Sequence, residues 1–458
     1  MTGLCADLVG MISGANTSSQ IREEPSCRES AVRQPWSFVP SMALFQSLTF
    51  CFVSVLPGLF LKSLGARNEL VGLASVFALP IAFRFFAGLA VDRRGSLRTW
   101  SIVTQLLSTV TVLAGAASVL TGAPLGITLG LFALAGLIAA FQDVATDGFF
   151  LFAIRPDRKA FYANLKVQIY RVGIVIGQGL YVMLAGRLIL DHHSPTAAWG
   201  RVFLLHGIVL ATLLIWNLIS FPTRIEGRRQ AEEGNFRWFV RMIVDFVRIP
   251  GMGRVLTFIA LFRVAESALT AMKAPFLLDP ISKGGLGLNL QDVGFLNGVL
   301  VFGVSILGGL VGGFWVQRKG LRRTLVPAVF LLNLPNVVFF WLALHPPEPG
   351  GTVQGLHLPL TVVFGLLAEG LANAVAFAPA IYLLIVCAQG PYRASLFAFA
   401  SGVMNLGWTL PGTVSGYLLT ALGYPAFFLL LAVLGLPVLF LIRGLPLEAL
   451  EERDRAGA

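Results

Sequence analysis

Long runs of apolar residues, each long enough to cross a bilayer as a helix, alternate along the chain with short polar connections. An α-helix needs about 20 consecutive apolar residues to span the hydrocarbon core, whereas a membrane-spanning β-strand needs only about 10. The run lengths therefore predict an all-α polytopic membrane protein and exclude a β-barrel. We expect twelve transmembrane helices, at residues 41–62, 69–91, 99–121, 124–154, 159–186, 199–221, 254–279, 290–316, 323–344, 357–387, 393–421 and 423–442.

Connections of unequal length divide these spans into two sets of six. The longest connection, residues 222–253, is polar and basic, which is typical of a cytoplasmic linker. It predicts one six-helix bundle at 39–221 and a second at 254–445. The remaining residues are expected to form a disordered cytoplasmic tail at 1–38 and a short cytoplasmic tail at 446–458.

A turn motif occurs twice and reveals an internal repeat. Segment 88–98, after the second span, reads GLAVDRRGSLR, and segment 313–323, after the eighth span, reads GFWVQRKGLRR. At nearly the same offset, Asp143 in the fourth span corresponds to Glu369 in the tenth. The repeat predicts two pseudosymmetric bundles. The residues of the first turn that we expect to gate a change of conformation are Gly88, Asp92, Arg93, Gly95 and Arg98.

The composition agrees with a membrane protein and limits the kinds of partner. Apolar residues make up 56% of the chain and charged residues 12%, whereas an average soluble domain carries about 25% charged residues. The net charge of +11 comes mainly from Lys and Arg in short connections, where these residues report orientation rather than nucleic-acid binding. We expect both termini in the cytoplasm, contact with membrane lipid and no nucleic-acid partner. The four cysteines lack the spacing of a metal site, so we expect no cofactor and no metal.

Charged residues inside the apolar spans are the candidate functional residues. A charge exposed to lipid costs at least about 2.5 to 3.5 kcal/mol, so such residues face a bundle interior or a wet cavity. The interiors of spans 3, 9 and 12 carry no charged residue, and span 6 carries only His206. The charged residues within spans 4, 7 and 10 are Asp143, Asp147, Arg263, Glu266, Lys273 and Glu369.

Two acids of the fourth span face a polar stripe on the fifth. Asp143 and Asp147 lie one helical turn apart, and Gln168 and Arg171 share one face of the next helix. Counting from the intervening turn places Asp143 level with Arg171, so we expect these two side chains to pair. Lys166 is expected to point away, which leaves Asp147 as the better proton carrier. The alternative is a structural ion pair that locks the two helices together.

The remaining charged residues allow more than one role. Arg263 and Glu266 either satisfy each other or bind a ligand, and Lys273 is expected at the outer rim of its span. Arg84 either pairs with an acid of another helix or faces the cavity. The proton-coupling candidates are therefore Asp147, Asp143, Glu266 and Glu369, and the substrate-binding candidates are Arg171, Arg263, Gln168 and Arg84.

These motifs resemble those of the major facilitator superfamily, and within it the AmpG-type muropeptide permeases and the related branch of peptide, acetyl-CoA and drug transporters. The most specific element is Gln-Asp-Val-Ala-Thr-Asp at 142–147. The resemblance extends over about 41–443. Further matching segments are 83–93, 170–173, 262–266, 392–395 and Glu369.

The resemblance implies that helices 1, 4, 7 and 10 line a cavity between the bundles, and that helices 3, 6, 9 and 12 face lipid. It implies proton symport of an anhydromuropeptide-type cell-wall fragment across the bacterial inner membrane, and we expect a monomer. Gln317 stands where many members of the superfamily carry Asp. Drug antiporters of the superfamily typically carry a Gly-Pro element in the fifth helix. No proline lies near Gln178 in that helix, which argues against drug efflux.

Other readings of the sequence stay open. A transporter of the same branch could carry a siderophore, a peptide or an acyl-CoA-like solute. More remote alternatives are a receptor that does not transport and an intramembrane enzyme. We expect no enzyme, because the chain lacks a Gly-x-Gly-Asp protease element, a His-Glu-x-x-His motif and a nucleotide-binding loop.

Overall fold

The computed structural model describes residues 35–93, 96–154, 158–222, 236–347, 352–353, 356–357, 359–387, 393–448 and 450. Most of these residues are helical, apart from a short antiparallel pair formed by β1 (Thr352–Val353) and β2 (Leu356–His357). The predicted all-α fold is confirmed. Most of the predicted N-terminal tail lies outside the described residues.

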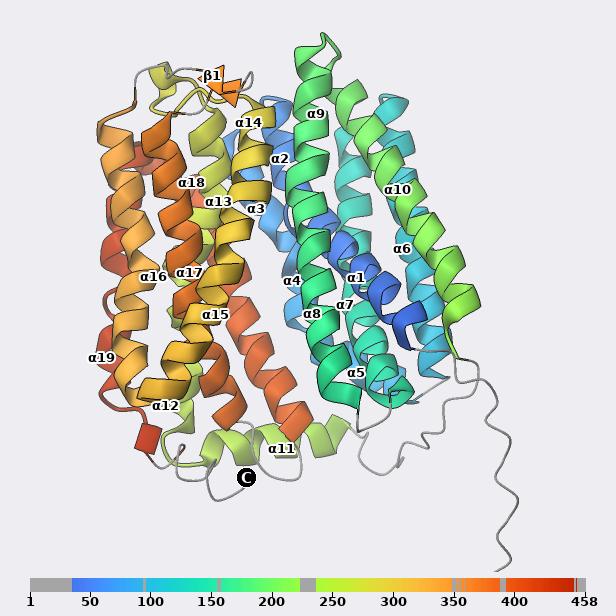
Figure 1. Ribbon diagram of the computed structural model, residues 1–458, viewed down its shortest axis with the longest axis vertical. Coiled ribbons are helices and arrows are strands. Elements are labelled where there is room, and N and C mark those ends of the chain that lie inside the picture. The colour runs from blue at the N-terminus through green and yellow to red at the C-terminus, as the bar shows by residue number, and fades with distance from the viewer. Residues whose placement is uncertain are drawn as a thin grey trace, which may run out of the picture. The chain divides into compact units, whose positions relative to one another are not determined.

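The helices follow one another along the chain as the apolar runs predict (Figure 1). The first half contains η1 (Pro35–Ser37), α1 (Val39–Ser54), α2 (Leu56–Ser63), α3 (Asn68–Leu73), η2 (Ala74–Ala78), α4 (Leu79–Ala82), α5 (Arg84–Arg93), α6 (Leu97–Leu120), α7 (Leu125–Ala153), α8 (Lys159–Val175), the π-helix η4 (Ile176–Leu180), α9 (Tyr181–Leu190) and α10 (Pro195–Ser220).

The second half contains α11 (Phe236–Arg248), α12 (Met252–Phe262), α13 (Val264–Leu278), η5 (Ile281–Lys283), α14 (Leu290–Gly294), the π-helix η6 (Phe295–Val301), α15 (Phe302–Lys319), α16 (Leu321–Leu344), α17 (Leu360–Cys387), α18 (Arg393–Leu434) and α19 (Val438–Ile442).

Eleven helical segments of the described residues are long and apolar enough to cross a membrane. The last segment, Leu396–Ile442, has 47 residues, which at about 1.5 Å per residue is more than twice the thickness of a bilayer core. It breaks at Gly423, whose φ of 72° is in the left-handed region that glycine adopts without strain. This segment therefore makes two crossings, and the protein is a multi-pass membrane protein with the twelve predicted spans.

Several spans are interrupted along their length. The first divides at Val55 into α1 and α2, with a proline in the first turn of α2, where its missing N–H is tolerated. The second passes through η2 and α4 before α5 begins at Arg84. The seventh breaks at Arg263, which has non-helical angles of φ −104° and ψ 5° between α12 and α13. Two candidate site residues, Arg84 and Arg263, thus lie at interruptions.

The two ends of the helix bundle differ in their connections. We call the end that carries α11 and the turn between α15 and α16 the basic end, because Arg318, Lys319, Arg322 and Arg323 lie in that turn (Figure 1). We call the opposite end, with β1 and the turn after α9, the far end. Helix α11 lies across the basic end and buries Met242 and Phe246 against the second half.

Close contacts between glycines join the two halves. A Cβ atom at Gly72 in α3 would lie 2.8 Å from the backbone nitrogen of Gly416 in α18, and one at Gly179 in η4 would lie 3.0 Å from Cα of Gly298 in η6. A side chain at either contact would push the helices apart, so these positions permit an approach that larger residues do not. Helices α9 and α14 also pack against each other, next to the η4 and η6 contact.

The outer faces of α6, α10 and α16 are apolar and exposed. On α10, the exposed side chains include Ile208, Ile215, Trp216 and Ile219. Exposed apolar surface of this extent suits contact with lipid chains. This arrangement agrees with the expectation that helices 3, 6 and 9 face lipid.

The predicted gating turn lies partly outside the described residues. Gly95 is not among them, and the side chains of Asp92 and Arg93 are also outside the description. Gly88 lies where α5 packs against α7, and a Cβ there would make ordinary contact with Val144 at 3.7 Å. Arg98 donates a hydrogen bond to the backbone oxygen of Leu218 at 3.2 Å. The gating role of this turn stays a prediction.

Candidate functional site

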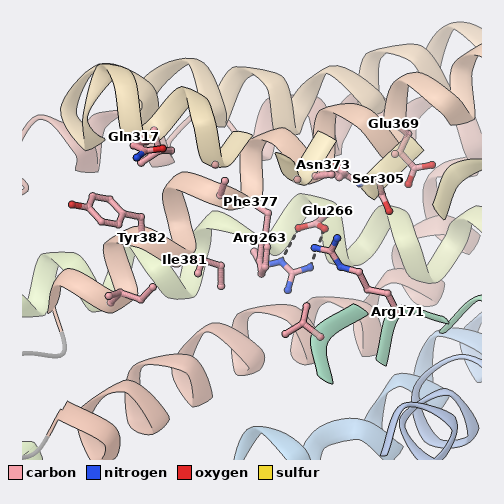
Figure 2. Close-up of a pocket in the computed structure, with 18 of the residues that line it drawn as sticks. Arg171, Arg263, Glu266, Ser305, Gln317, Glu369, Asn373, Phe377, Ile381 and Tyr382 are labelled. Carbon is pink, nitrogen blue, oxygen red and sulfur yellow. Dashed lines mark hydrogen bonds and ion pairs between the residues drawn. The ribbon is translucent and has the colours of Figure 1, made fainter. Parts of the chain in front are cut away.

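A cavity of about 1300 Å³, here called the central cavity, lies between the two halves and extends to the basic end (Figure 2). The first half contributes Val167 and Arg171 from α8, and the second half contributes side chains of α13, α15 and α17. At the basic end the wall includes Arg318, Lys319 and Arg323. The cavity is therefore reached from that end, while glycine contacts hold the halves together nearer the far end.

Arg263 and Glu266 form a bidentate ion pair in the wall of the central cavity. Arg263 donates from Nε to Oε2 at 2.8 Å and from Nη2 to Oε1 at 2.9 Å. Its guanidinium lies 3.9 Å from the ring centre of Trp408 and 4.8 Å from that of Phe377. Of the two alternatives that the sequence left open, the structure shows the one in which Arg263 and Glu266 pair with each other, and a ligand role for either stays a prediction. Two hydrogen bonds and two aromatic faces fix this guanidinium in place.

Lys273 and Glu369 form a second ion pair, which joins α13 to α17. The ammonium donates to both carboxylate oxygens, at 2.7 and 2.9 Å, and the side chains are only 12% and 2% exposed. The expectation that Lys273 lies at an outer rim is therefore wrong. Lys273 follows Glu266 by seven residues, so it shares a helical face with the other cavity residues rather than facing outward.

Arg171 extends from α8 toward the Arg263 and Glu266 pair (Figure 2). The expected partnership of Arg171 with Asp143 is wrong, because Asp143 pairs with Arg84 instead. Among the residues that the structure describes, Arg171 has no hydrogen bond or ion pair, and its guanidinium lies beside Gly309 of α15. Arg171 is thus a cation in the cavity wall that makes no ion pair within the described part of the chain.

The acids of the fourth span lie in a separate cluster within the first half. Arg84 donates to Asp143 at 2.7 Å and also to Ser401 of α18 at 3.1 Å, across the boundary between the halves. Lys166 donates to Asp147, so the expectation that Lys166 points away is wrong. Gln46 of α1 donates to both acids, including a bond to Asp147 at 3.3 Å. Each acid therefore has a cation and an amide donor.

Two smaller chambers adjoin the central cavity. One, of about 270 Å³, is lined by the Asp143 and Arg84 pair and touches the central cavity at Ile381. The other, of about 260 Å³, shares Lys273 and Ser305 with the central cavity and also contains Trp408. The three spaces thus share lining residues, and charged residues of both halves line them.

The sequence reasoning missed several residues of this region. Gln46 and Trp408 were not among its candidates, and Lys273 was placed elsewhere. A glutamine in the middle of an apolar span was the available signal for Gln46. Gln168, predicted to bind substrate, is exposed and donates to Asn164 at 3.3 Å, outside the wall of the central cavity. Within the described part of the chain, no cluster of three or more His, Cys, Asp or Glu could hold a metal.

Comparisons with known proteins identify the family of this chain. The sequence profile of the Major Facilitator Superfamily matches residues 38–352 and 275–457. The anhydromuropeptide permease of Escherichia coli is 24% identical over 380 residues, which are 81% of this chain and 72% of that protein.

Two solved structures share the fold. A D-xylose-proton symporter superposes with a TM-score of 0.66 at 12% identity, over 90% of this chain and 97% of the other. A bacterial homologue of the human lysosomal transporter Spinster, solved inward-facing and unoccupied, superposes with a TM-score of 0.66 at 14% identity, over 91% and 95% of the two chains.

Proposed function

Because the chain belongs to the Major Facilitator Superfamily and is a transporter rather than an enzyme, we propose that it imports an anionic solute by proton symport. The observation that carries the proposal is Arg171, a cation in the wall of the central cavity that makes no ion pair with any described residue. We propose an anhydromuropeptide-type cell-wall fragment as the cargo, which the similarity to the Escherichia coli permease supports.

The charge of the central cavity favours an anionic cargo. Its wall carries two acids, Glu266 and Glu369, and both already pair with cations. The cations in the wall outnumber the acids and are Arg171, Arg263, Lys273, Arg318, Lys319 and Arg323. A guanidinium binds a carboxylate with two parallel hydrogen bonds, so Arg171 is suited to hold one carboxylate of the cargo. The cations at the basic end would attract the same charge.

We place the protein in the bacterial inner membrane with both termini in the cytoplasm. The basic end would then face the cytoplasm, as expected from the enrichment of Lys and Arg in cytoplasmic loops. The central cavity would open inward in this conformation. Import then requires a second conformation, in which the two bundles rock so that the cavity opens at the far end.

Our candidates for proton coupling are four acids within the spans, namely Asp143, Asp147, Glu266 and Glu369. Each lies beside a cation, and an acid that exchanges such a partner for water or ligand can gain and lose a proton. Arg84 and Gln168 stay candidates for substrate binding. We propose that the turn after the second span gates the change of conformation, through Gly88, Asp92, Arg93, Gly95 and Arg98. We also propose that the protein functions as a monomer and that its basic connections interact with anionic lipid.

Uptake into proteoliposomes tests the proposal. We expect a labelled anhydromuropeptide to accumulate against its gradient when the interior is alkaline, and a protonophore to abolish the accumulation. A siderophore, a peptide and an acyl-CoA serve as competing cargoes in the same vesicles. Accumulation of one of these instead would make the cargo assignment wrong. Accumulation that the protonophore does not affect would show that the coupling ion is not the proton.

A further inference from the structure

The ion pair of Lys273 and Glu369 joins two spans within the wall of the central cavity, and no other ion pair between described residues does so. The pair Arg263–Glu266 lies in the same wall but within one span. The pairs of Asp143 and Asp147 lie outside that wall. Breaking the pair of Lys273 and Glu369 would therefore free α13 and α17 from each other beside the cargo.

The two cavity pairs differ in how firmly their cations are held. Arg263 makes two hydrogen bonds to Glu266 and lies between two aromatic rings, which fixes its position. Lys273 holds Glu369 through a single ammonium, which a different anion can approach by rotation of a flexible side chain. An incoming carboxylate can thus replace Glu369 more easily than Glu266.

Lys273 can also be reached by a ligand. It lines both the central cavity and the smaller chamber that contains Trp408, and Ser305 lines both spaces beside it. Arg171, which has no anionic partner among the described residues, faces the same central cavity from α8. A cargo that bears two carboxylates could contact both cations.

We propose that a carboxylate of the cargo takes the place of Glu369 on Lys273, and that the displaced Glu369 then binds the transported proton. This inference rests on the proposed function, because it assigns the coupling step of the same transport cycle. An acid that loses its cation in a nearly dry site favours its neutral form. Cargo binding and proton binding would therefore require each other.

The step conserves charge and atoms. One O–H bond forms on the Glu369 carboxylate, with a proton taken from water while the cavity is open to the outside. The cargo carboxylate replaces the Glu369 charge beside Lys273, so the pair stays neutral. When the cargo leaves on the cytoplasmic side, Glu369 returns its proton to water and pairs again with Lys273.

Other charged groups around Glu369 are compatible with this exchange. The charged residues that line the same cavity as Glu369 are Arg263 and Glu266 at the start of α13 and Arg171 on α8. Helices α15 and α16 contribute Arg318, Lys319 and Arg323 at the basic end, and neither η6 nor the described part of α18 places a charged side chain in that wall. Since Glu266 is held by Arg263, Glu369 is the acid of this wall that the cargo can release.

The proton uptake of the purified transporter tests the inference. On addition of the anhydromuropeptide in weakly buffered detergent solution, we expect wild type to bind about one proton per cargo. On addition of the same fragment with amidated carboxylates, the transporter should bind no proton. In vesicles, Glu369→Gln should lower the accumulation ratio to one while exchange of labelled cargo persists at a reduced rate. Glu448→Gln, an acid of an exposed ion pair outside the cavity, is the matched control and should behave as wild type.

The outcomes separate this inference from the proposed function. If wild type does not accumulate the fragment at all, the proposed function is wrong. If wild type accumulates it and Glu369→Gln does so equally, the inference alone is wrong. Should Glu369→Gln fail to fold, the double variant Lys273→Gln and Glu369→Gln removes both charges. Proton uptake with the amidated fragment on wild type would overturn the inference without any variant.

Discussion

At the scale of single residues, the site depends on which cations have an anion. Arg263, Lys273, Arg84 and Lys166 each contact an acid of this protein. Arg171 does not, among the residues described, although it lies in the same cavity. A buried or half-buried cation without an anion is unfavourable, which favours the proposal that an anion of the cargo binds there.

Arg171→Ala should raise the KM for anionic cargo without altering the fold. A hydrogen-bonded contact to a charged group contributes about 1.5 to 3 kcal/mol, which corresponds to a loss of affinity of roughly tenfold to a hundredfold. Arg171→Lys should recover part of the loss, because an ammonium lacks the fork that binds a carboxylate bidentately. Uptake kinetics measure the effect. Arg187→Ala, an exposed arginine near the far end, is the control, and an equal KM in both variants would contradict the prediction.

Asp143→Asn should destabilise the protein, because Arg84 would lose the anion it contacts at 2.7 Å. We expect a loss of roughly 2 kcal/mol, with part of it restored in the double variant Asp143→Asn and Arg84→Gln. Thermal unfolding in detergent measures both. A matched double-mutant cycle on the exposed pair of Arg187 and Asp191 is the control, and there the coupling free energy should be at most about 1 kcal/mol. Equal coupling in the two cycles would show that Arg84 does not depend on Asp143.

At the scale of helices, the sequence predicted the spans well because their length and apolar content are local properties. It also predicted that the charged residues of the seventh and tenth spans face a cavity, and the central cavity is lined by Arg263, Glu266, Lys273 and Glu369. It offered the pairing of Arg263 with Glu266 as one of two alternatives, but it paired Asp143 with Arg171, whereas Asp143 contacts Arg84. The level of a residue along a hairpin follows from counting, but the direction of its side chain depends on packing. The interruption before Arg84 redirects the second span, and that side chain then reaches Asp143 from a helix the hairpin argument did not consider.

The contact between η4 and η6 depends on glycine. A Cβ atom at Gly298 would overlap the backbone of Gly179, so Gly298→Ala should force these two helices apart. Overpacking of this kind costs about 1 to 3 kcal/mol, which would weaken the closed contact and slow transport roughly five- to a hundredfold. Gly303→Ala is the control, because a Cβ there meets no atom within 4 Å. Equal transport rates in the two variants would mean that the contact does not limit the cycle.

At the scale of the whole bundle, a polar cluster joins the two halves at the far end. Lys62 of α2 contacts Asp279, which ends α13, at 2.7 Å, and both side chains are nearly buried. Tyr424 donates to the same carboxylate at 2.6 Å, and Lys62 donates to Asn68 at 2.7 Å. The central cavity extends to the opposite, basic end. The cluster therefore stabilises the conformation in which the far end is closed, and it must separate for the cavity to open there.

Lys62→Gln should shift the population of conformations toward the one that is open at the far end. Asp279 would keep its bond from Tyr424 but lose its cation, and each 1.4 kcal/mol lost from the closed contact changes the ratio of conformations by about tenfold. Spin labels at Leu190→Cys and Ser282→Cys, on opposite halves of the far end, should report a larger share of long distances. Lys283→Gln removes an exposed lysine from the same end and should leave the distribution as in wild type. If both lysine variants give the wild-type distribution, the cluster does not hold the far end closed. The far end would then be held closed by the glycine contacts of Gly72 with Gly416 and of Gly179 with Gly298.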